Sequence, residues 1–166
     1  PIGLMLTRLC AINGAHVTAA ARRLEALAHA TAHGAHETIL VGANEGGLTL
    51  GAQPGSSFDV VFDAGGAAET AALAISAVGK GGTVSLFAGC PSGTKVPLDV
   101  TRVHYDEIRI LGSFHHTPAA FRASFRLIET GAVEPAKFIS ARKTLADLAQ
   151  SLVNPAPGAL KTLVLF

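Results

Sequence analysis

The fold is decided by the stretch Phe58-Asp59-Val60-Val61-Phe62-Asp63-Ala64-Gly65-Gly66, the alanine-rich run 67–78, Gly79-Lys80-Gly81-Gly82, and Thr83-Val84-Ser85-Leu86-Phe87-Ala88-Gly89. The two outer runs are apolar and bounded by glycines, which is typical of strands buried on both faces. The run between them repeats apolar residues at helical spacing. The stretch therefore predicts a βαβ unit, whose strands end in small residues at the edge where parallel sheets bind ligands.

The composition is that of an ordinary globular domain. Of the 166 residues, 49% are hydrophobic and 15% are charged, with a net charge of +1. This balance excludes disorder and gives no reason to expect a nucleic acid or a membrane as partner. No apolar run approaches the roughly 18 residues of a spanning helix. Cys10 and Cys90 lie in no paired motif, so we expect a reduced, cytoplasmic setting.

Helices and strands are expected to alternate along the rest of the chain. Glycines and a proline dominate residues 42–57, so this segment is expected to be a loop. The alternation predicts an α/β fold with a parallel sheet covered on both faces. Helices are expected at 2–12, 22–33, 98–105, 118–131 and 145–153, and further strands at 16–21, 38–41, 107–112, 138–139 and 162–166.

Two places in the first forty residues suggest a dinucleotide site. Gly3, in the first turn of a helix, could be the last glycine of a phosphate-binding loop, although glycine is common there. The strand that follows ends at Ala21 without the carboxylate that would bind an adenosine ribose, and Arg22 and Arg23 come next. Guanidinium groups suit a 2′-phosphate, which favours NADP over NAD. The alternative is two solvated arginines at a helix start.

Other reactive side chains have plainer interpretations. Asp63 ends a strand and could be a catalytic acid, but a carboxylate that binds nearby backbone is the stronger interpretation. His29 and His33 share a helix face, yet no third metal ligand is within sequence reach. His115 and His116 follow the strand 107–112, where one of them could contact a substrate. We predict no catalytic residue and no metal ligand in this chain.

A family resemblance covers nearly the whole chain. The sequence resembles the medium-chain dehydrogenase/reductase family, and within it the zinc-dependent alcohol and polyol dehydrogenases of the sorbitol and iditol type. The segments that carry the resemblance are Pro1-Ile2-Gly3-Leu4, Gly14-Ala15-His16-Val17, Arg23-Leu24-Glu25, Gly34-Ala35, 58–63, Gly81-Gly82-Thr83-Val84, His104-Tyr105-Asp106-Glu107 and Leu111-Gly112-Ser113-Phe114.

The resemblance implies a Rossmann-type doubly wound sheet that lacks its first strand. Residues 1–133 would form the nucleotide-binding domain, and residues 134–166 would return to a catalytic domain. Pro1, Ile2 and Gly3 would lie under the pyrophosphate, and Ala21, Arg22 and Arg23 would lie beside the adenosine ribose. The residues expected to line the groove and the nicotinamide are Ala64, Gly65, Ala88, Gly89, Leu111, Gly112 and Ser113.

The resemblance also implies an activity. The parent enzyme would move a hydride between a polyol-like secondary alcohol and NAD or NADP, with zinc polarising the alcohol. The family's zinc ligands and first two phosphate-loop glycines have no counterpart here, so we expect a fragment that is inactive alone. A non-catalytic nucleotide-binding module and a zinc-free, quinone-reductase-like enzyme remain alternatives. The edge strand 107–112 would build a homodimer or tetramer.

Overall fold

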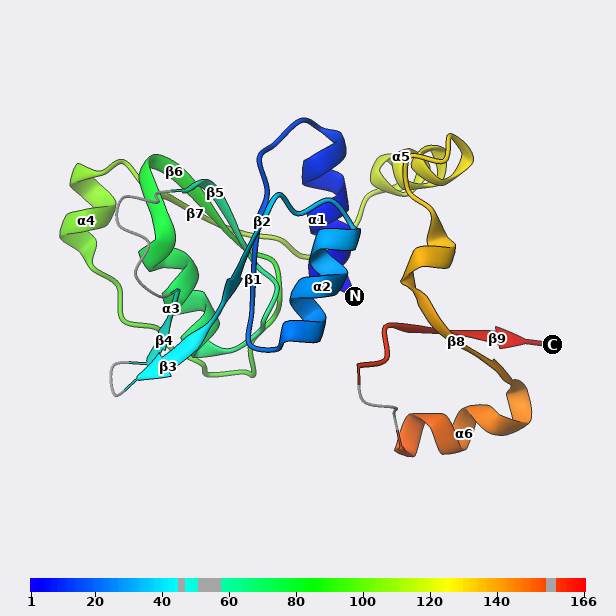
Figure 1. Cartoon of the computed structure of the whole chain (residues 1–166). Helices are drawn as coiled ribbons and strands as arrows, with labels where there is room; N and C mark the ends of the chain where they lie inside the picture. Colours follow the sequence, from blue (N-terminus) through cyan, green and yellow to red (C-terminus); the bar gives the residue numbers. More distant parts are fainter. Residues whose placement is uncertain (45–46, 51–57, 155–157) are drawn as a thin grey trace. The chain divides into compact units, whose positions relative to one another are not determined.

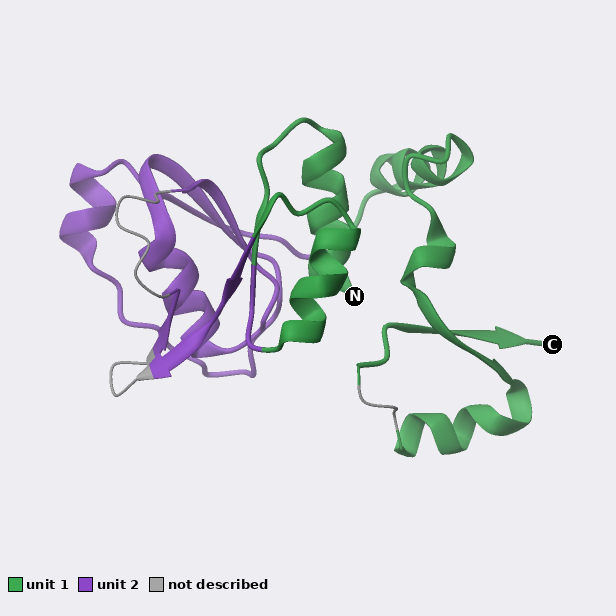
Figure 2. Ribbon diagram, in the orientation of Figure 1, with its two compact units in different colours: residues 1–19, 23–37, 116–166 green, residues 20–22, 38–115 purple. Residues whose placement is uncertain are grey.

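The computed structural model describes residues 1–44, 47–50, 58–154 and 158–166 (Figure 1). The chain forms two compact units (Figure 2). One comprises residues 1–19, 23–37 and 116–166, and the other residues 20–22 and 38–115. Among the described helices, none combines the length and the apolar character that crossing a membrane requires.

The predicted βαβ unit is present in the second unit. Strand β5 (Phe58–Asp63) leads into helix α3 (Ala68–Ala77) and then strand β6 (Val78–Leu86). Strand β7 (Arg109–Gly112) joins the same sheet, in the order β5-β6-β7, and both pairings are parallel. This confirms the α/β class and the parallel sheet. Strand β6 begins earlier than expected, because its pairing with β5 is irregular between Phe58 and Val60.

The core of this unit lies between the sheet and α3. Val84, in the central strand, is fully buried, and Val78, where α3 passes into β6, is 1% exposed. Ala74 of α3 and Ile108 before β7 complete the buried cluster, and four half-buried apolar side chains pack against it. The alanines of α3 allow the helix to lie close to the strands, because they carry no long side chain.

Strand β5 forms one end of this sheet. Among the described residues, it pairs only with β6. Two of its apolar side chains remain open to solvent: Val60 is 52% exposed and Phe62 is 41% exposed. A row of unpaired backbone groups therefore lies beside exposed apolar side chains. The first strands of the chain, β1 (Thr18–Ala21) and β2 (Glu37–Leu40), form a separate two-stranded sheet.

The expectation of a loop at 42–57 is wrong for part of that segment. Strands β3 (Gly42–Asn44) and β4 (Gly47–Thr49) pair in antiparallel fashion, with Ala43 opposite Leu48. The glycine content concealed this hairpin, because backbone pairing, rather than an apolar pattern, defines it. Residues 45–46 and 51–57 lie outside the described part of the chain.

Helix α4 (Val100–Tyr105) is tied to the end of α3 by one arginine. The Asp99 carboxylate caps α4 by accepting the amide of Arg102 at 3.0 Å. The guanidinium of Arg102 donates to the carbonyl of Ile75 at 2.6 Å and to the carbonyl of Val78. It also lies 3.6 Å from the Asp106 carboxylate. Arg102 therefore supplies donors to carbonyls that the end of α3 leaves unpaired.

The other unit begins with two helices. Helix α1 (Ile2–Ile12) and helix α2 (Leu24–Ala32) each end one residue before a glycine-containing turn. Gly34, after α2, has φ +101°, and a Cβ there would lie 2.9 Å from the Cβ of Ala11. The glycine therefore serves both the left-handed turn and the close approach of the two helices.

The same unit contains the C-terminal third of the chain. Helix α5 (Pro118–Glu129) begins as predicted, with the Thr117 side chain as cap and proline in the first turn. Phe138 ends a short 3₁₀ helix (Pro135–Phe138) instead of lying in a strand, and it packs on the His33 ring at 4.5 Å between centroids. Strand β8 (Ile139–Thr144), helix α6 (Leu145–Val153) and strand β9 (Lys161–Leu165) follow, and β8 and β9 are parallel.

Candidate functional site

The carboxyl ends of β5, β6 and β7 lie in register at one edge of the sheet. Asp63 pairs with Leu86, and Leu86 pairs with Gly112. Small residues lie at or just beyond each of these positions, although Leu86 and Phe87 are large, and a Cβ on Gly89 or Gly112 would meet nothing within 4 Å. The edge brings together seven residues expected to line the cofactor groove: Ala64, Gly65, Ala88, Gly89, Leu111, Gly112 and Ser113.

Asp63 binds backbone groups at this edge. Its Oδ1 accepts the amide of Gly65 at 2.9 Å, and its carbonyl accepts the amides of Phe87 at 3.1 Å and Ala88 at 2.9 Å. The residue is 4% exposed. The structure therefore agrees with the prediction of a carboxylate that binds nearby backbone. The side chain of Asp63 closes the turn after β5, and its carbonyl binds amides of the turn after β6.

Two glycines fit tightly into this edge. Gly66 has φ +73°, and a Cβ there would lie 2.9 Å from the carbonyl oxygen of Gly89. A Cβ on Gly65 would lie 2.6 Å from Oγ1 of Thr70, whose hydroxyl accepts the amide of Ala67 at 3.2 Å. Sequence reasoning had not singled out Gly66, although an Asp-x-Gly-Gly run at a strand end is a turn signal.

The two arginines precede α2. Ala21 ends β1, and its carbonyl accepts the amide of Val41 at 2.9 Å. Arg22 and Arg23 are exposed, and Arg23 is the extended N-cap residue, with φ −127° and ψ 135°. The predicted start of this helix at Arg22 is therefore wrong, because the backbone stays extended through Arg23. Arg22 belongs to the unit of the β5-β6-β7 sheet and Arg23 to the other unit.

The first turn of α1 has no acidic residue, and the N-cap residue Pro1 makes no side-chain hydrogen bond in the described part of the chain. Pro1, Ile2 and Gly3 are exposed. The Gly3 carbonyl accepts the Thr7 hydroxyl at 3.0 Å, so the backbone of this turn is held by its own helix. Amide groups in such a turn can bind an anion.

The other candidate side chains have the following surroundings in the described part of the chain. Within the described residues, no group of three or more His, Cys, Asp and Glu side chains is placed to hold a metal ion. His33 is buried, and its Nδ1 lies 2.7 Å from the carbonyl of His29. Both cysteines are free, and burial raises the pKa of the Cys10 thiol. His115 has φ +65° and its ring lies against Phe114.

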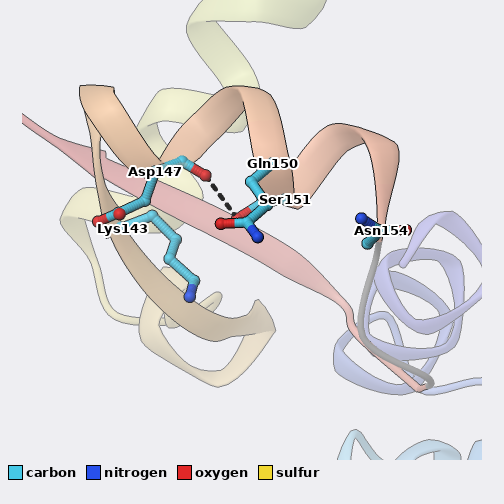
Figure 3. Close-up of a pocket in the computed structure, with 5 residues that line it drawn as sticks. All are labelled: Lys143, Asp147, Gln150, Ser151 and Asn154. Carbon is cyan, nitrogen blue, oxygen red and sulfur yellow. Dashed lines mark hydrogen bonds between the residues drawn. The ribbon is translucent and has the colours of Figure 1, made fainter.

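A polar hollow of about 220 Å³ lies on α6 (Figure 3). Two of its lining side chains make hydrogen bonds at the start of α6 and within it. The Asp147 carboxylate accepts the Thr144 hydroxyl at 2.7 Å, and the Ser151 hydroxyl donates to the Asp147 carbonyl at 2.9 Å. The described residues that line the hollow are Lys143, Asp147, Gln150, Ser151 and Asn154. None of these was expected to contact a cofactor.

Solved structures share this architecture. The chain superposes with a TM-score of 0.87 on a protein from Sinorhizobium meliloti 1021 described as a zinc-binding dehydrogenase and bound to NADP, with 29% identity over 99% of this chain and 49% of that one. A thermostable alcohol dehydrogenase from Pyrobaculum aerophilum, bound to cobalt and zinc, gives 0.78 and 25% identity over 98% and 46%. L-idonate 5-dehydrogenase from Escherichia coli gives 0.83 at 19% identity over 100% and 47%, which shows the fold alone.

These likenesses define the class: the fold is that of the Rossmann-type half of medium-chain dehydrogenases. The model of the zinc-binding dehydrogenase family matches residues 1–130, and the chain belongs to that family. The resemblance seen in the sequence is thereby confirmed. The chain spans about half the length of the solved relatives. No curated protein matches the sequence.

Proposed function

We propose that this chain is the cofactor-binding half of an oxidoreductase that transfers a hydride between a polyol-like secondary alcohol and a nicotinamide dinucleotide. The observation that carries the proposal is the strand-end edge, where β5, β6 and β7 end in register at Asp63, Leu86 and Gly112, with Ala64-Gly65 and Ala88-Gly89 close behind. Parallel α/β sheets bind ligands outside the carboxyl ends of their strands. The free space beside Gly89 and Gly112, where a Cβ would meet nothing within 4 Å, supports close approach of a dinucleotide to the main chain.

Each part of the dinucleotide has a proposed partner. The first turn of α1, with Gly3, would hold the pyrophosphate through its free amides. Arg22 and Arg23 would bind a 2′-phosphate on the adenosine ribose, which favours NADP. The groove and the carboxamide would be contacted by Ala64, Gly65, Ala88, Gly89, Leu111, Gly112 and Ser113. The bound dinucleotide would supply the hydride acceptor or donor.

The described residues do not fit a zinc site, since no cluster of three metal-binding side chains occurs among them. We therefore derive no step through zinc on this chain, although the family's zinc chemistry is part of the proposed parent activity. The role proposed for this chain is to bind and orient the cofactor. The alcohol substrate, of polyol type, would be selected elsewhere in the enzyme.

The decisive experiment titrates the purified protein, produced as its complete natural polypeptide, with NADPH and with NADH, and follows nicotinamide fluorescence. We expect tighter binding of NADPH. The double variant Arg22→Ala/Arg23→Ala should lose about tenfold in NADPH affinity, since charge-assisted hydrogen bonds are worth about 1.5–3 kcal/mol, and should bind NADH as before.

Arg109→Ala is the matched control. This exposed arginine begins β7, at the opposite end of the strand from Gly112, so its loss should leave both affinities unchanged. Equal NADPH and NADH binding that the double variant does not alter would contradict the role of the arginines. Binding of neither cofactor would contradict the proposed function.

We also propose the domain organisation, location and assembly expected from the sequence. Residues 1–133 would form the nucleotide-binding domain and residues 134–166 would return to the catalytic domain; the end of the family match at residue 130 supports this boundary. The two free cysteines support a reducing, cytoplasmic setting.

A homodimer or tetramer would pair residues 107–112 with a second copy. Strand β7 ends the described order β5-β6-β7, and Leu111 is 52% exposed, which supports this interface. Leu111→Lys should lower the mass measured by light scattering, whereas Arg122→Ala, at an exposed position of α5 outside this segment, should not. An unchanged mass in Leu111→Lys would contradict this assembly.

A further inference from the structure

The carboxylate of Asp63 uses only one of its two oxygens. Oδ1 accepts the amide of Gly65 at 2.9 Å and so closes the turn that follows β5. Oδ2 is buried and has no hydrogen-bond partner among the described residues. An unpaired buried acceptor lowers stability, so each such atom in a folded protein needs an explanation. Residues that break a rule of stability are expected mainly at functional or strained positions.

The same residue also connects two turns. Its carbonyl accepts the amides of Phe87 and Ala88, which belong to the turn after β6. Gly66 then comes so close to the Gly89 carbonyl that a Cβ would lie 2.9 Å away. The turn after β5 and the turn after β6 are therefore in contact at two places, at Asp63 and at Gly66. A change in the first turn displaces the second, because the backbones are in contact.

We propose that Asp63 is a positioning residue that locks the 64–66 turn and the 87–89 turn into one rigid backbone surface for the dinucleotide. This inference rests on the proposed function. Asp63 is only 4% exposed, so we expect it to act through the two turns and not by touching the cofactor. The role requires an acceptor at the Oδ1 position and does not require a negative charge. An asparagine can therefore replace it, whereas an alanine cannot.

Three variants test whether Asp63 couples the two turns. Asp63→Ala removes the acceptor, Asp63→Asn keeps it, and Val84→Ala lowers stability from the fully buried centre of the same sheet without touching either turn. Amide hydrogen exchange reports on each turn without any ligand. The affinity for NADPH and NADH, measured as above, reports on the surface they form.

In Asp63→Ala, we expect amide exchange to rise about fivefold at Gly65 and also at Phe87 and Ala88, the change expected for loss of one hydrogen bond. Cofactor affinity should fall by a similar factor. Asp63→Asn should resemble the unaltered protein in both measurements. Val84→Ala should leave the affinity unchanged at temperatures where it is folded. If Asp63→Ala does not fold, Asp63→Leu replaces it, because its side chain has nearly the same shape as aspartate and also lacks an acceptor.

Two results would overturn the inference. One is faster exchange at Gly65 alone, with Phe87 and Ala88 unchanged, because the two turns would then be independent. The other is an Asp63→Asn variant that loses as much affinity as Asp63→Ala, because the charge would then be essential. If the unaltered protein binds neither cofactor, the proposed function fails, while the exchange measurements still decide whether Asp63 couples the two turns.

Discussion

Replacement of Arg102 by alanine should destabilise the unit that contains the β5-β6-β7 sheet. The guanidinium donates to the carbonyls of Ile75 and Val78, and it lies 3.6 Å from the Asp106 carboxylate. Its side chain is 29% exposed, so solvent screens these contacts only partly. Without it, two carbonyls at the end of α3 lose their charged donor. Val78, one of the two, is among the most buried residues of the protein.

The expected loss follows from the two hydrogen bonds. A hydrogen bond to a charged group contributes about 1.5–3 kcal/mol. Water can reach part of the site and replace part of this, so we expect a net loss of about 3 kcal/mol in the free energy of unfolding. For a chain of this length, each kcal/mol lowers the melting temperature by about 2–4 °C, so the shift should be about 6–12 °C.

Lys80→Ala is the matched control. The Lys80 ammonium lies 3.6 Å from the same Asp106 carboxylate, but its side chain is 85% exposed. An exposed pair contributes about 0–1 kcal/mol, so this variant should melt within about 4 °C of the unaltered protein. Arg102→Lys should be about as unstable as Arg102→Ala. The planar guanidinium places two nitrogen donors against two carbonyls, whereas the ammonium of lysine has a single nitrogen.

Thermal unfolding followed by circular dichroism, together with urea titration, measures these differences. The Arg102→Ala effect should persist at high salt, since its main contribution is hydrogen bonding rather than screened charge. The reasoning is refuted if Arg102→Ala costs no more than Lys80→Ala, or if Arg102→Lys restores full stability. Either result would mean that the end of α3 does not depend on this guanidinium.

Two further predictions concern single residues. Gly34→Ala should lower the melting temperature more than Gly14→Ala. Both positions have positive φ, but only at Gly34 would the Cβ meet a neighbouring atom, at 2.9 Å. Equal shifts in melting temperature would contradict the packing argument. Iodoacetamide should label the exposed Cys90 faster than Cys10, because burial raises the pKa of the Cys10 thiol and lowers the fraction present as thiolate. Mass spectrometry of the labelled peptides measures both rates, and faster labelling of Cys10 would contradict the prediction.

Sequence patterns were sufficient where local chemistry determines the element. The βαβ unit is marked by two apolar runs and the alanine-rich segment between them, and the structure places β5, α3 and β6 there. The start of α5 is marked by Thr117 and Pro118, and Thr117 caps the helix. In both cases the signal lies within the sequence of the element itself, so no contact with a distant residue was needed to predict it.

Pairing and close approach were not accessible in this way. Strand β8 (Ile139–Thr144) has mainly exposed, polar side chains, and it is a strand because it pairs with β9, about twenty residues later. The hairpin of β3 and β4 was missed for a similar reason. At the site, the sequence identified Asp63 as a backbone-binding carboxylate, but the contact of Gly66 with Gly89 depends on how two turns meet in space.

The exposed edge of β5 has a practical consequence for anyone who purifies this chain. Its outer backbone groups, which pair with no other described strand, run beside the exposed side chains of Val60 and Phe62. Such a strand can add a strand from another molecule, including another copy of itself, and the tendency rises with concentration. Storage at low concentration, or a lysine in place of Val60, would suppress self-association, since a charged side chain opposes the stacking of identical strands.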